Sequence, residues 1–363
     1  MSSVILKELS NQDIDWMLAT GERVEVLPGT VLVEQGQFLN ALYILLEGAL
    51  TVTLNQESAD PLGRAFAVLE GGIPGREVAH LEKGEIIGVP LFENNLSSTT
   101  VYARKKSVVL MVPNAKLIQK LHQDLEFAAH LYRAFAVMLA NRLQQMMKEL
   151  GRSTSVLSKP QLREALIIFG ELHDSDIDWL IAAGQIQVFP TGSILIRSGR
   201  PTEALYILLD GTVALNASDD DGNVLAHAFS NLEDSKSQPL EREFGRLSRG
   251  DMVGETPFIE VQPEAVTVKA VKDSRVLSIP KWRLSAKLLH DVGFAVRFYR
   301  VLAIILADKQ TSLVQRLGYG RLTYSSDQSL DDSFANELNN YSLTQMGLAG
   351  ARFDWMLKRI RIE

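Results

Sequence analysis

Short apolar runs alternate with single glycines through the first part of the chain and predict its secondary structure. Asp13–Gly21 begins with acidic residues and ends at a glycine, which is typical of a short helix, and Ser10 is placed to cap it. Thr30–Val33, Leu42–Leu46 and Leu50–Leu54 follow as apolar segments. Closely spaced short strands with glycine turns indicate a closed or sandwiched antiparallel β structure.

Large apolar residues then recur every three or four positions over Lys116–Leu150, which predicts a long amphipathic helix. The whole pattern returns later in the chain. Residues 13–48 match residues 176–211 at an offset of 163, with 16 of 36 positions identical. At an offset of 167 Phe127 matches Phe294 within a second helical pattern, Trp282–Leu317. A repeat of this length indicates a duplicated domain.

The duplication sets the expected domain boundaries. Residues 1–150 form a first domain, 151–171 a linker with a short helix, 172–318 a second domain, and 319–363 a tail. The fold class is α+β, with two β-rolls of the jelly-roll kind that are each followed by a long C-terminal helix. Both predicted long helices carry an apolar stripe.

Composition and charge restrict the function. The chain has 46% hydrophobic residues, no cysteine and a formal net charge of −7. No apolar stretch approaches the ~20 residues of a membrane span, so we expect a cytoplasmic protein. Acidity argues against general nucleic-acid affinity, and DNA is not expected as a partner. The sequence offers no nucleophile–base pair and no metal-ligand spacing, so neither an enzyme nor a metal site is expected.

The motifs that carry a family resemblance lie in the two predicted rolls. They are PGTVLVEQGQFLNALYILLEGALTV (28–52), TGSILIRSGRPTEALYILLDGTVAL (191–215), KGEIIG (83–88) and RGDMVGE (249–255). These segments resemble the cyclic nucleotide-binding domain of catabolite regulators, kinase regulatory subunits and gated channels. Dimers of that family pair their long helices, so the resemblance implies that Lys116–Leu150 and Trp282–Leu317 pack together within one molecule as a pseudo-dimer. The tandem arrangement is also similar to the cyanobacterial bacteriocin-type transport-associated proteins. That likeness implies an association with peptide export and no enzymatic activity.

The resemblance also implies a phosphate-binding cassette, which opens with Gly-Glu and ends with an arginine shortly before a threonine. In the second copy Gly254 and Glu255 supply the opening and Thr267 matches the end. Glu264 stands where the resemblance places the arginine, and a carboxylate there would repel a phosphate. We therefore expect no cofactor, with a cyclic nucleotide disfavoured.

The cassette of the first copy is one residue shorter and departs further from the family pattern. Gly88 opens it, Val89 replaces the glutamate, and Ser97 or Ser98 replaces the arginine, followed by Thr99. The sequence thus predicts two degenerate sites, and the first is expected to be the weaker.

The final residues combine an apolar face with basic side chains. Either this face packs against the chain's own core, or it docks on a partner protein or a membrane surface. We favour a partner, because the two domains look complete without the tail. The candidate partner-binding residues are Phe353, Trp355, Met356, Leu357, Arg359 and Ile360.

Two functions remain open from the sequence. The first is a non-enzymatic scaffold or adaptor that serves a secretion or transport assembly or another protein partner. The alternative is a ligand-gated regulator that binds cyclic AMP, cyclic GMP or another anion in its second domain. Homo-oligomerisation is compatible with both.

Overall fold

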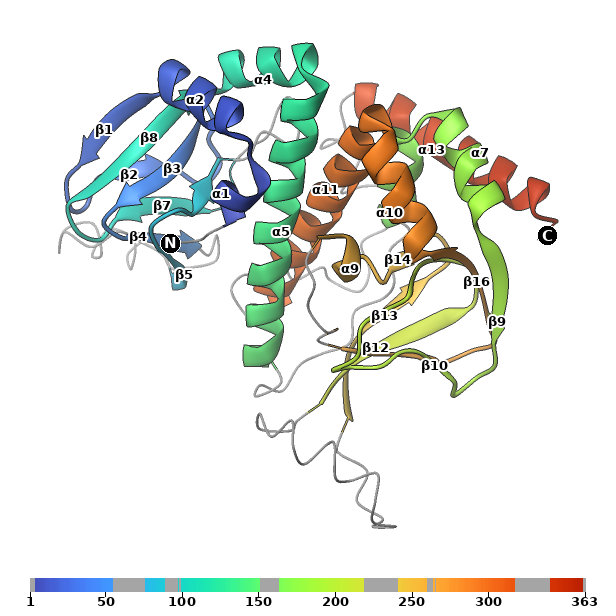
Figure 1. Ribbon diagram of the computed structural model, residues 1–363. Coiled ribbons are helices and arrows are strands. Elements are labelled where there is room, and N and C mark those ends of the chain that lie inside the picture. The colour runs from blue at the N-terminus through green and yellow to red at the C-terminus, as the bar shows by residue number, and fades with distance from the viewer. Residues whose placement is uncertain are drawn as a thin grey trace. The chain divides into compact units, whose positions relative to one another are not determined.

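The computed structural model describes residues 4–54, 76–88, 97, 99–150, 163–218, 241–259, 264, 266–316 and 340–361 (Figure 1). The fold is mixed α and β, with two β-rolls and associated helices, as the sequence predicts. Contacts divide the chain into two compact units. Unit 1 contains residues 1–141 and 291–333, and unit 2 contains residues 142–290 and 334–363.

The roll of unit 1 consists of two four-stranded antiparallel sheets that enclose an apolar core. The sheet orders are β1-β8-β3-β6 and β2-β7-β4-β5. The core is built from side chains such as Leu45, Leu50 and Val109, each fully buried. The strands are β1 (Glu22–Val26), β2 (Val31–Val33), β3 (Ala41–Glu47), β4 (Leu50–Leu54), β5 (Arg76–Leu81), β6 (Ile86–Ile87), β7 (Thr100–Ala103) and β8 (Ser107–Pro113).

The roll of unit 2 repeats this topology, with sheet orders β9-β16-β11-β14 and β10-β15-β12-β13. Leu208, Val213 and Val276 are fully buried in its core. The strands are β9 (Gln185–Phe189), β10 (Ile194–Ile196), β11 (Ala204–Asp210), β12 (Thr212–Ser218), β13 (Glu241–Ser248), β14 (Met252–Val253), β15 (Thr267–Ala270) and β16 (Ser274–Pro280). The apolar segments of both copies therefore form the strands that their pattern predicts.

A short helical pair precedes each roll. In unit 1 these helices are α1 (Val4–Glu8) and α2 (Asn11–Thr20), and in unit 2 they are α6 (Arg163–Glu171) and α7 (Asp174–Ala183). The predicted cap of α2 is confirmed. The Ser10 hydroxyl accepts a hydrogen bond from the Asp13 amide at 3.2 Å, and the Asp13 carboxylate accepts one from the Ser10 amide at 2.8 Å. This reciprocal pair satisfies two amides at the start of the helix.

The prediction of one continuous helix after each roll is wrong, because each helical pattern is broken by an aspartate. The first divides into α4 (Asn114–Gln123) and α5 (Leu125–Leu150), and the second into α10 (Lys281–His290) and α11 (Val292–Arg316). Asp124 accepts a hydrogen bond from the Phe127 amide at 3.0 Å, and Asp291 accepts one from the Phe294 amide at 2.8 Å. An aspartate in this role caps the helix that follows it, so one helix ends and another begins at each of these two residues.

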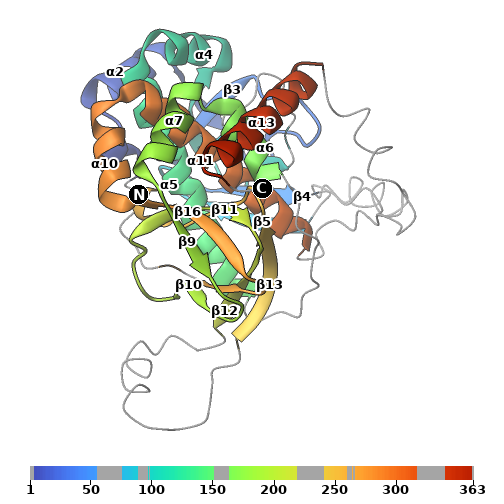
Figure 2. The same cartoon turned by 90° about the vertical axis from the view of Figure 1, so that its right-hand side faces the viewer.

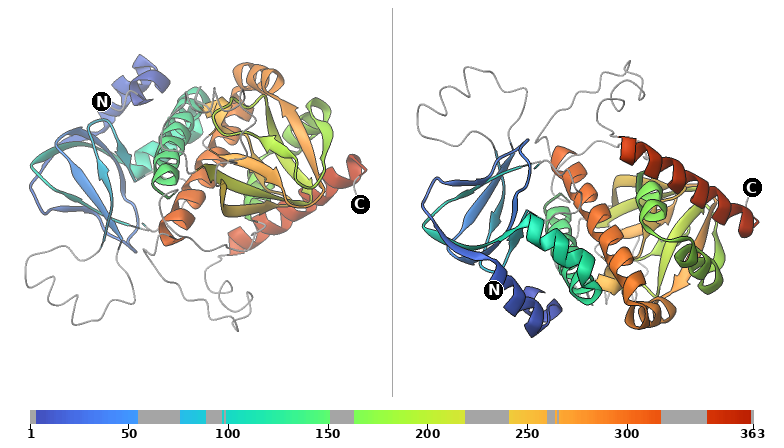
Figure 3. Two further views of the ribbon diagram at one scale, coloured as in Figure 1. Left: turned by 90° about the horizontal axis from the view of Figure 1, so that it is seen from below. Right: turned by 90° about the horizontal axis from the view of Figure 1, so that it is seen from above.

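The two long helices contact each other within unit 1, as predicted. Figure 3 shows α11 beside the portion of α5 that belongs to this unit. The Arg133 guanidinium of α5 lies over the Tyr299 ring of α11, 5.8 Å from its centroid. From Val301 to Leu306 every side chain of α11 is buried. A helix that is apolar on all sides needs cover on more than one face, which explains why α11 groups with residues of the first copy.

The tail forms a helix, α13 (Asn340–Arg359), that packs against α6 and α7 within unit 2 (Figure 2). Phe353, Met356 and Leu357 are buried, and the Phe353 ring lies 5.0 Å from the ring of Phe169. The expectation that these three side chains serve a partner is therefore wrong, since they contribute to the core of their own chain. Trp355, Arg359 and Ile360 retain exposed surface.

Candidate ligand-binding cassette

The opening of the second cassette is held in a fixed backbone conformation by a glycine. Gly254 follows β14 with φ +85°, and a Cβ there would lie 2.6 Å from the Ala204 carbonyl oxygen. Glycine is therefore needed for both conformation and space. Glu255 is half-buried, and its carbonyl accepts a hydrogen bond from the Phe258 amide in the short helix α9 (Thr256–Ile259).

Glu264 is built into the framework on the other side of this cassette. Its amide donates to the Arg200 carbonyl at 3.2 Å, and its carbonyl accepts from the Gly199 amide at 2.9 Å. The Glu264 side chain is also tied down, because the Thr202 hydroxyl donates to its carboxylate at 2.8 Å. Glu264 is only 8% exposed and Thr202 only 6%. The carboxylate is therefore an ordered, buried part of the site.

Thr267 also links the end of the cassette to the turn between β10 and β11. Its hydroxyl accepts a hydrogen bond from the Ser198 amide at 3.2 Å, at the turn between β10 and β11. Arg197 and Arg200 in this turn, and Lys269 on β15, have exposed side chains. These three basic side chains thus lie on the surface of unit 2, whereas the carboxyl group of Glu264 is buried.

The first copy reproduces this framework with a serine in the place of the glutamate. The Ser97 amide donates to the Gln37 carbonyl at 2.9 Å, and the Ser97 carbonyl accepts from the Gly36 amide at 2.8 Å. These bonds match those of Glu264 and decide that Ser97, rather than Ser98, occupies the arginine position. The Ser97 hydroxyl donates to the Thr99 carbonyl at 2.7 Å, so it is engaged with its own backbone.

Gly88 also fulfils its predicted role at the opening of the first cassette, with φ +82° and a would-be Cβ 2.5 Å from the Ala41 carbonyl oxygen. Val89 and Ser98 lie outside the described residues. Thr100 is the counterpart of Thr267, since its hydroxyl accepts from the Gln35 amide at 3.1 Å. Thr99, which the sequence suggested for this position, is not the counterpart. The offset of 167 between the copies would have identified Thr100.

Thr202 was also missed from the sequence. Its hydroxyl meets Glu264 from a position 62 residues earlier in the chain. No local motif marks such a contact, because it forms only when β10, β11 and the cassette come together in the folded roll. Comparison of the two copies does not identify Thr202 either, because Leu39 stands at the matching position of the first copy.

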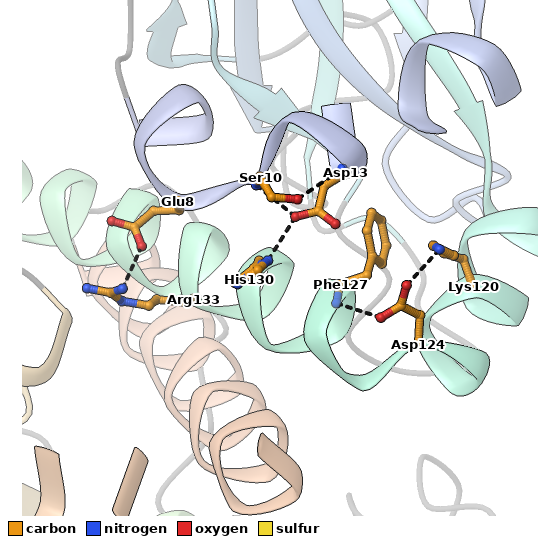
Figure 4. A network of polar contacts seen from close by, with 8 residues as sticks. All are labelled: Glu8, Ser10, Asp13, Lys120, Asp124, Phe127, His130 and Arg133. Carbon is orange, nitrogen blue, oxygen red and sulfur yellow. Dashed lines mark hydrogen bonds and ion pairs between the residues drawn. The ribbon is translucent and has the colours of Figure 1, made fainter. Parts of the chain in front are cut away.

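The helices around the first roll are linked by charged side chains, as Figure 4 shows. His130 on α5 contacts the buried Asp13 carboxylate at 2.8 Å, through its Nδ1. Glu8 of α1 forms an ion pair with Arg133 at 3.0 Å. Burial raises the pKa of the Tyr299 phenol, and the nearby Arg133 charge partly opposes that increase. Arg133 therefore joins α1, α5 and α11.

The described residues contain no group of three or more His, Cys, Asp or Glu side chains placed to hold a metal ion. None of the helices in the described ranges is long and apolar enough to cross a membrane.

A model of the cyclic nucleotide-binding domain matches residues 23–124 and 186–291, one match in each roll. The chain belongs to the cyclic nucleotide-binding domain family. Each match includes one cassette, so the family assignment applies to both copies. The chain is thus a tandem cyclic nucleotide-binding-domain protein.

Two curated relatives illustrate the extent of similarity. A cAMP-activated global transcriptional regulator of Pasteurella multocida is 28% identical over 122 residues, which cover 33% of this chain and 50% of the regulator. A lysophospholipase of Scheffersomyces stipitis is 22% identical over 298 residues, covering 76% of this chain and 16% of the lysophospholipase. The chain therefore spans half or less of the length of either relative.

Solved structures with the same kind of domain are more distant. The regulatory domain of Toxoplasma gondii PKA with cAMP has 16% identity and a TM-score of 0.29, covering 85% of this chain and 92% of the other. A cyclic nucleotide-binding domain from Methylobacillus flagellatus has 15% identity and a TM-score of 0.34, covering 43% and 82%.

Proposed function

We propose that this tandem protein is a non-enzymatic regulatory adaptor that acts through protein contacts, and that neither cassette holds a cyclic nucleotide by the usual phosphate contact. The observation that carries this proposal is the position of Glu264. A buried carboxylate, fixed by Thr202, stands where the family resemblance places the phosphate-pairing arginine.

The energetic effect of this replacement is large. Loss of a charge-assisted hydrogen bond costs about 1.5–3 kcal/mol. A carboxylate about 4–5 Å from a phosphate adds repulsion of roughly 3–4 kcal/mol at an effective dielectric constant near 20. Together these effects weaken binding on the order of a thousandfold or more. In the first copy the Ser97 hydroxyl supplies no charge and is engaged with its own backbone, which supports the same conclusion.

Isothermal titration calorimetry with cyclic AMP, cyclic GMP and cyclic dinucleotides tests the proposal. The wild-type protein should bind none of them at micromolar concentration. Glu264→Arg should gain affinity for a cyclic mononucleotide, because the opening at Gly254 and Glu255 is retained. Glu264→Gln is the matched control, since it keeps a hydrogen-bond acceptor for Thr202 but removes the repulsive charge. It should gain less than the arginine variant.

One result of these titrations would contradict the proposal. Micromolar binding by the wild type, lost on Glu255→Ala, would establish the second roll as a working nucleotide sensor. Circular dichroism spectra of each variant separate loss of binding from loss of folding.

A ligand-gated regulator is the second candidate. It is favoured by the opening of the second cassette, where Gly254 has a positive φ, Glu255 is half-buried, and α9 follows directly. In this case the ligand would be an anion recognised without the arginine. The same titrations, extended to inorganic phosphate and nucleoside monophosphates, distinguish the two functions.

For the partner of the adaptor we propose a peptide-export assembly, on the sequence resemblance to bacteriocin-type transport-associated proteins. Purified export components should be retained on the immobilised protein, and Glu264→Gln should leave this retention unchanged. Retention that depends on an added cyclic nucleotide would instead favour the ligand-gated function.

A further inference from the structure

Strand β9 of unit 2 lies at the edge of its sheet and exposes apolar side chains. Among the strands that the structure describes, β9 pairs only with β16, in the order β9-β16-β11-β14. Ile186 is 46% exposed and Val188 is 64% exposed. Their neighbours Gln185 and Gln187 are also exposed, whereas Phe189 is half-buried, packs against the roll core and contacts Tyr206. Because side chains alternate along a strand, Ile186 and Val188 share the face opposite to Phe189.

The corresponding edge strand of the first copy, β1, carries charged side chains. At the positions of Ile186 and Val188, β1 carries Arg23 and Glu25. Arg23 forms an ion pair with Glu47 at 3.4 Å, and Glu25 forms one with Lys106 at 2.9 Å. Charged side chains on an edge strand discourage another strand from pairing there, because their hydration would be lost. This protection is present in β1, whereas β9 carries no charge from Gln185 to Phe189.

We propose that β9 is a self-association surface on which the β9 strand of a second copy of this chain pairs antiparallel about Gln187. In this register Ile186 lies opposite Val188 of the second copy, and Gln187 lies opposite Gln187 of the second copy. The same pairing occurs twice by symmetry, as an isologous interface requires. β-Branched residues directly opposite each other stabilise an antiparallel pair.

The alternatives within the strand fit less well. A twofold axis at Ile186 would place Val188 opposite Gly184, and an axis at Val188 would place Ile186 opposite Pro190. Only the axis at Gln187 pairs both apolar residues with each other. Two five-residue strands bury much less than the ~800 Å² per partner of a standard stable interface. The dimer is therefore weak, and its population depends on protein concentration.

Sedimentation velocity of the full chain over a wide range of concentration provides the first test. The wild type should shift from the 40.3 kDa monomer toward the dimer as concentration rises. Ile186→Lys with Val188→Lys places like charges opposite each other and should weaken association at least tenfold. Ile186→Lys with Val188→Glu pairs opposite charges in the proposed register, so it should weaken association less, and high salt should remove that advantage. Phe38→Glu, at an exposed residue of the first copy, is the control and should change nothing.

The second test uses the fact that the chain contains no cysteine. Gln187→Cys introduces a single thiol at the proposed axis, where a mild oxidant should link two chains. Gln185→Cys, off the axis on the same strand, and Val24→Cys, at the matching position of β1, should be linked much more slowly.

The proposal is overturned if the wild type stays monomeric at every concentration and the Gln187→Cys variant is linked no faster than the two control variants. The same result is expected if β9 instead accepts an extended peptide of another protein. Association that persists unchanged when Ile186→Lys and Val188→Lys are combined would also overturn it, because the contact would then lie elsewhere.

Discussion

Replacing Phe353 by alanine tests whether α13 serves the fold or a partner. Phe353 is 5% exposed, and its ring lies 5.0 Å from the ring of the fully buried Phe169, tilted by 52°. The surrounding bonds hold α13 in place. Arg352 donates to the Leu172 carbonyl at 2.8 Å and pairs with Asp174 at 2.7 Å. The cavity left by Phe353→Ala therefore has a rigid wall that cannot easily collapse.

The expected magnitude follows from this burial. Phe→Ala in a packed core costs about 3–5 kcal/mol. In a domain of about 150–250 residues each kcal/mol lowers the melting temperature by roughly 2–4 °C. We therefore expect the transition of unit 2 to fall by roughly 6–20 °C in differential scanning calorimetry, by the product of these two ranges.

Trp355→Ala on the same helix is the matched control. Trp355 is 36% exposed, and its ring lies 5.3 Å from the guanidinium of Arg359. An exposed contact of this kind is worth about 0.5–1 kcal/mol, so the melting temperature should fall by only a few degrees. If Phe353→Ala destabilises no more than Trp355→Ala, α13 does not contribute to the core and the argument from burial is refuted.

Three further predictions concern single positions. Asp124→Ala should destabilise unit 1 by about 0.5–2 kcal/mol in urea unfolding, since Asp124 caps α5; an unchanged midpoint would refute the capping role. Lys120 and the Phe127 amide hold the pKa of Asp124 below its usual value, so its carboxylate stabilises the fold at neutral pH. The difference between wild type and Asp124→Asn should shrink as pH falls below about 4, where the unfolded state takes up protons first, and a difference that grows with acid would contradict this. Gly254→Ala should lower the melting temperature of unit 2, because its methyl group meets the Ala204 carbonyl at positive φ; the unhindered Gly347→Ala is its control.

The repeated rolls could be predicted because their signals are local. Alternating apolar residues and glycine turns specify strands over short distances, and the duplication doubles the evidence. The Ser10–Asp13 cap was predicted for the same reason, since both partners lie within four residues. The break at Asp124 was missed, although an aspartate three residues before Phe127 is a local capping signal. The apolar periodicity of the helix continued across it and concealed it.

The cassettes could be predicted only in part. Glu264 was found because it replaces a family residue at a fixed position in the chain. Its partner Thr202 was not, because a threonine in a turn carries no mark of the carboxylate that it contacts in the folded roll. In the first copy the sequence left Ser97 and Ser98 as alternatives, and the backbone bonds to Gly36 and Gln37 decided between them.

The sequence by itself determined the α+β class, the duplicated rolls and the positions of the degenerate cassettes, because each depends on residues close together in the chain. The tertiary structure decided where long-range surfaces are buried. The apolar face of α13 is compatible with a partner or with the chain's own core, and its contact with Phe169, far away in the sequence, selects the core. The sequence likewise does not show that β9 lies at the edge of a sheet; this follows from its pairing with β16 in the folded roll. Such choices depend on which surfaces meet in three dimensions, and local pattern does not encode that.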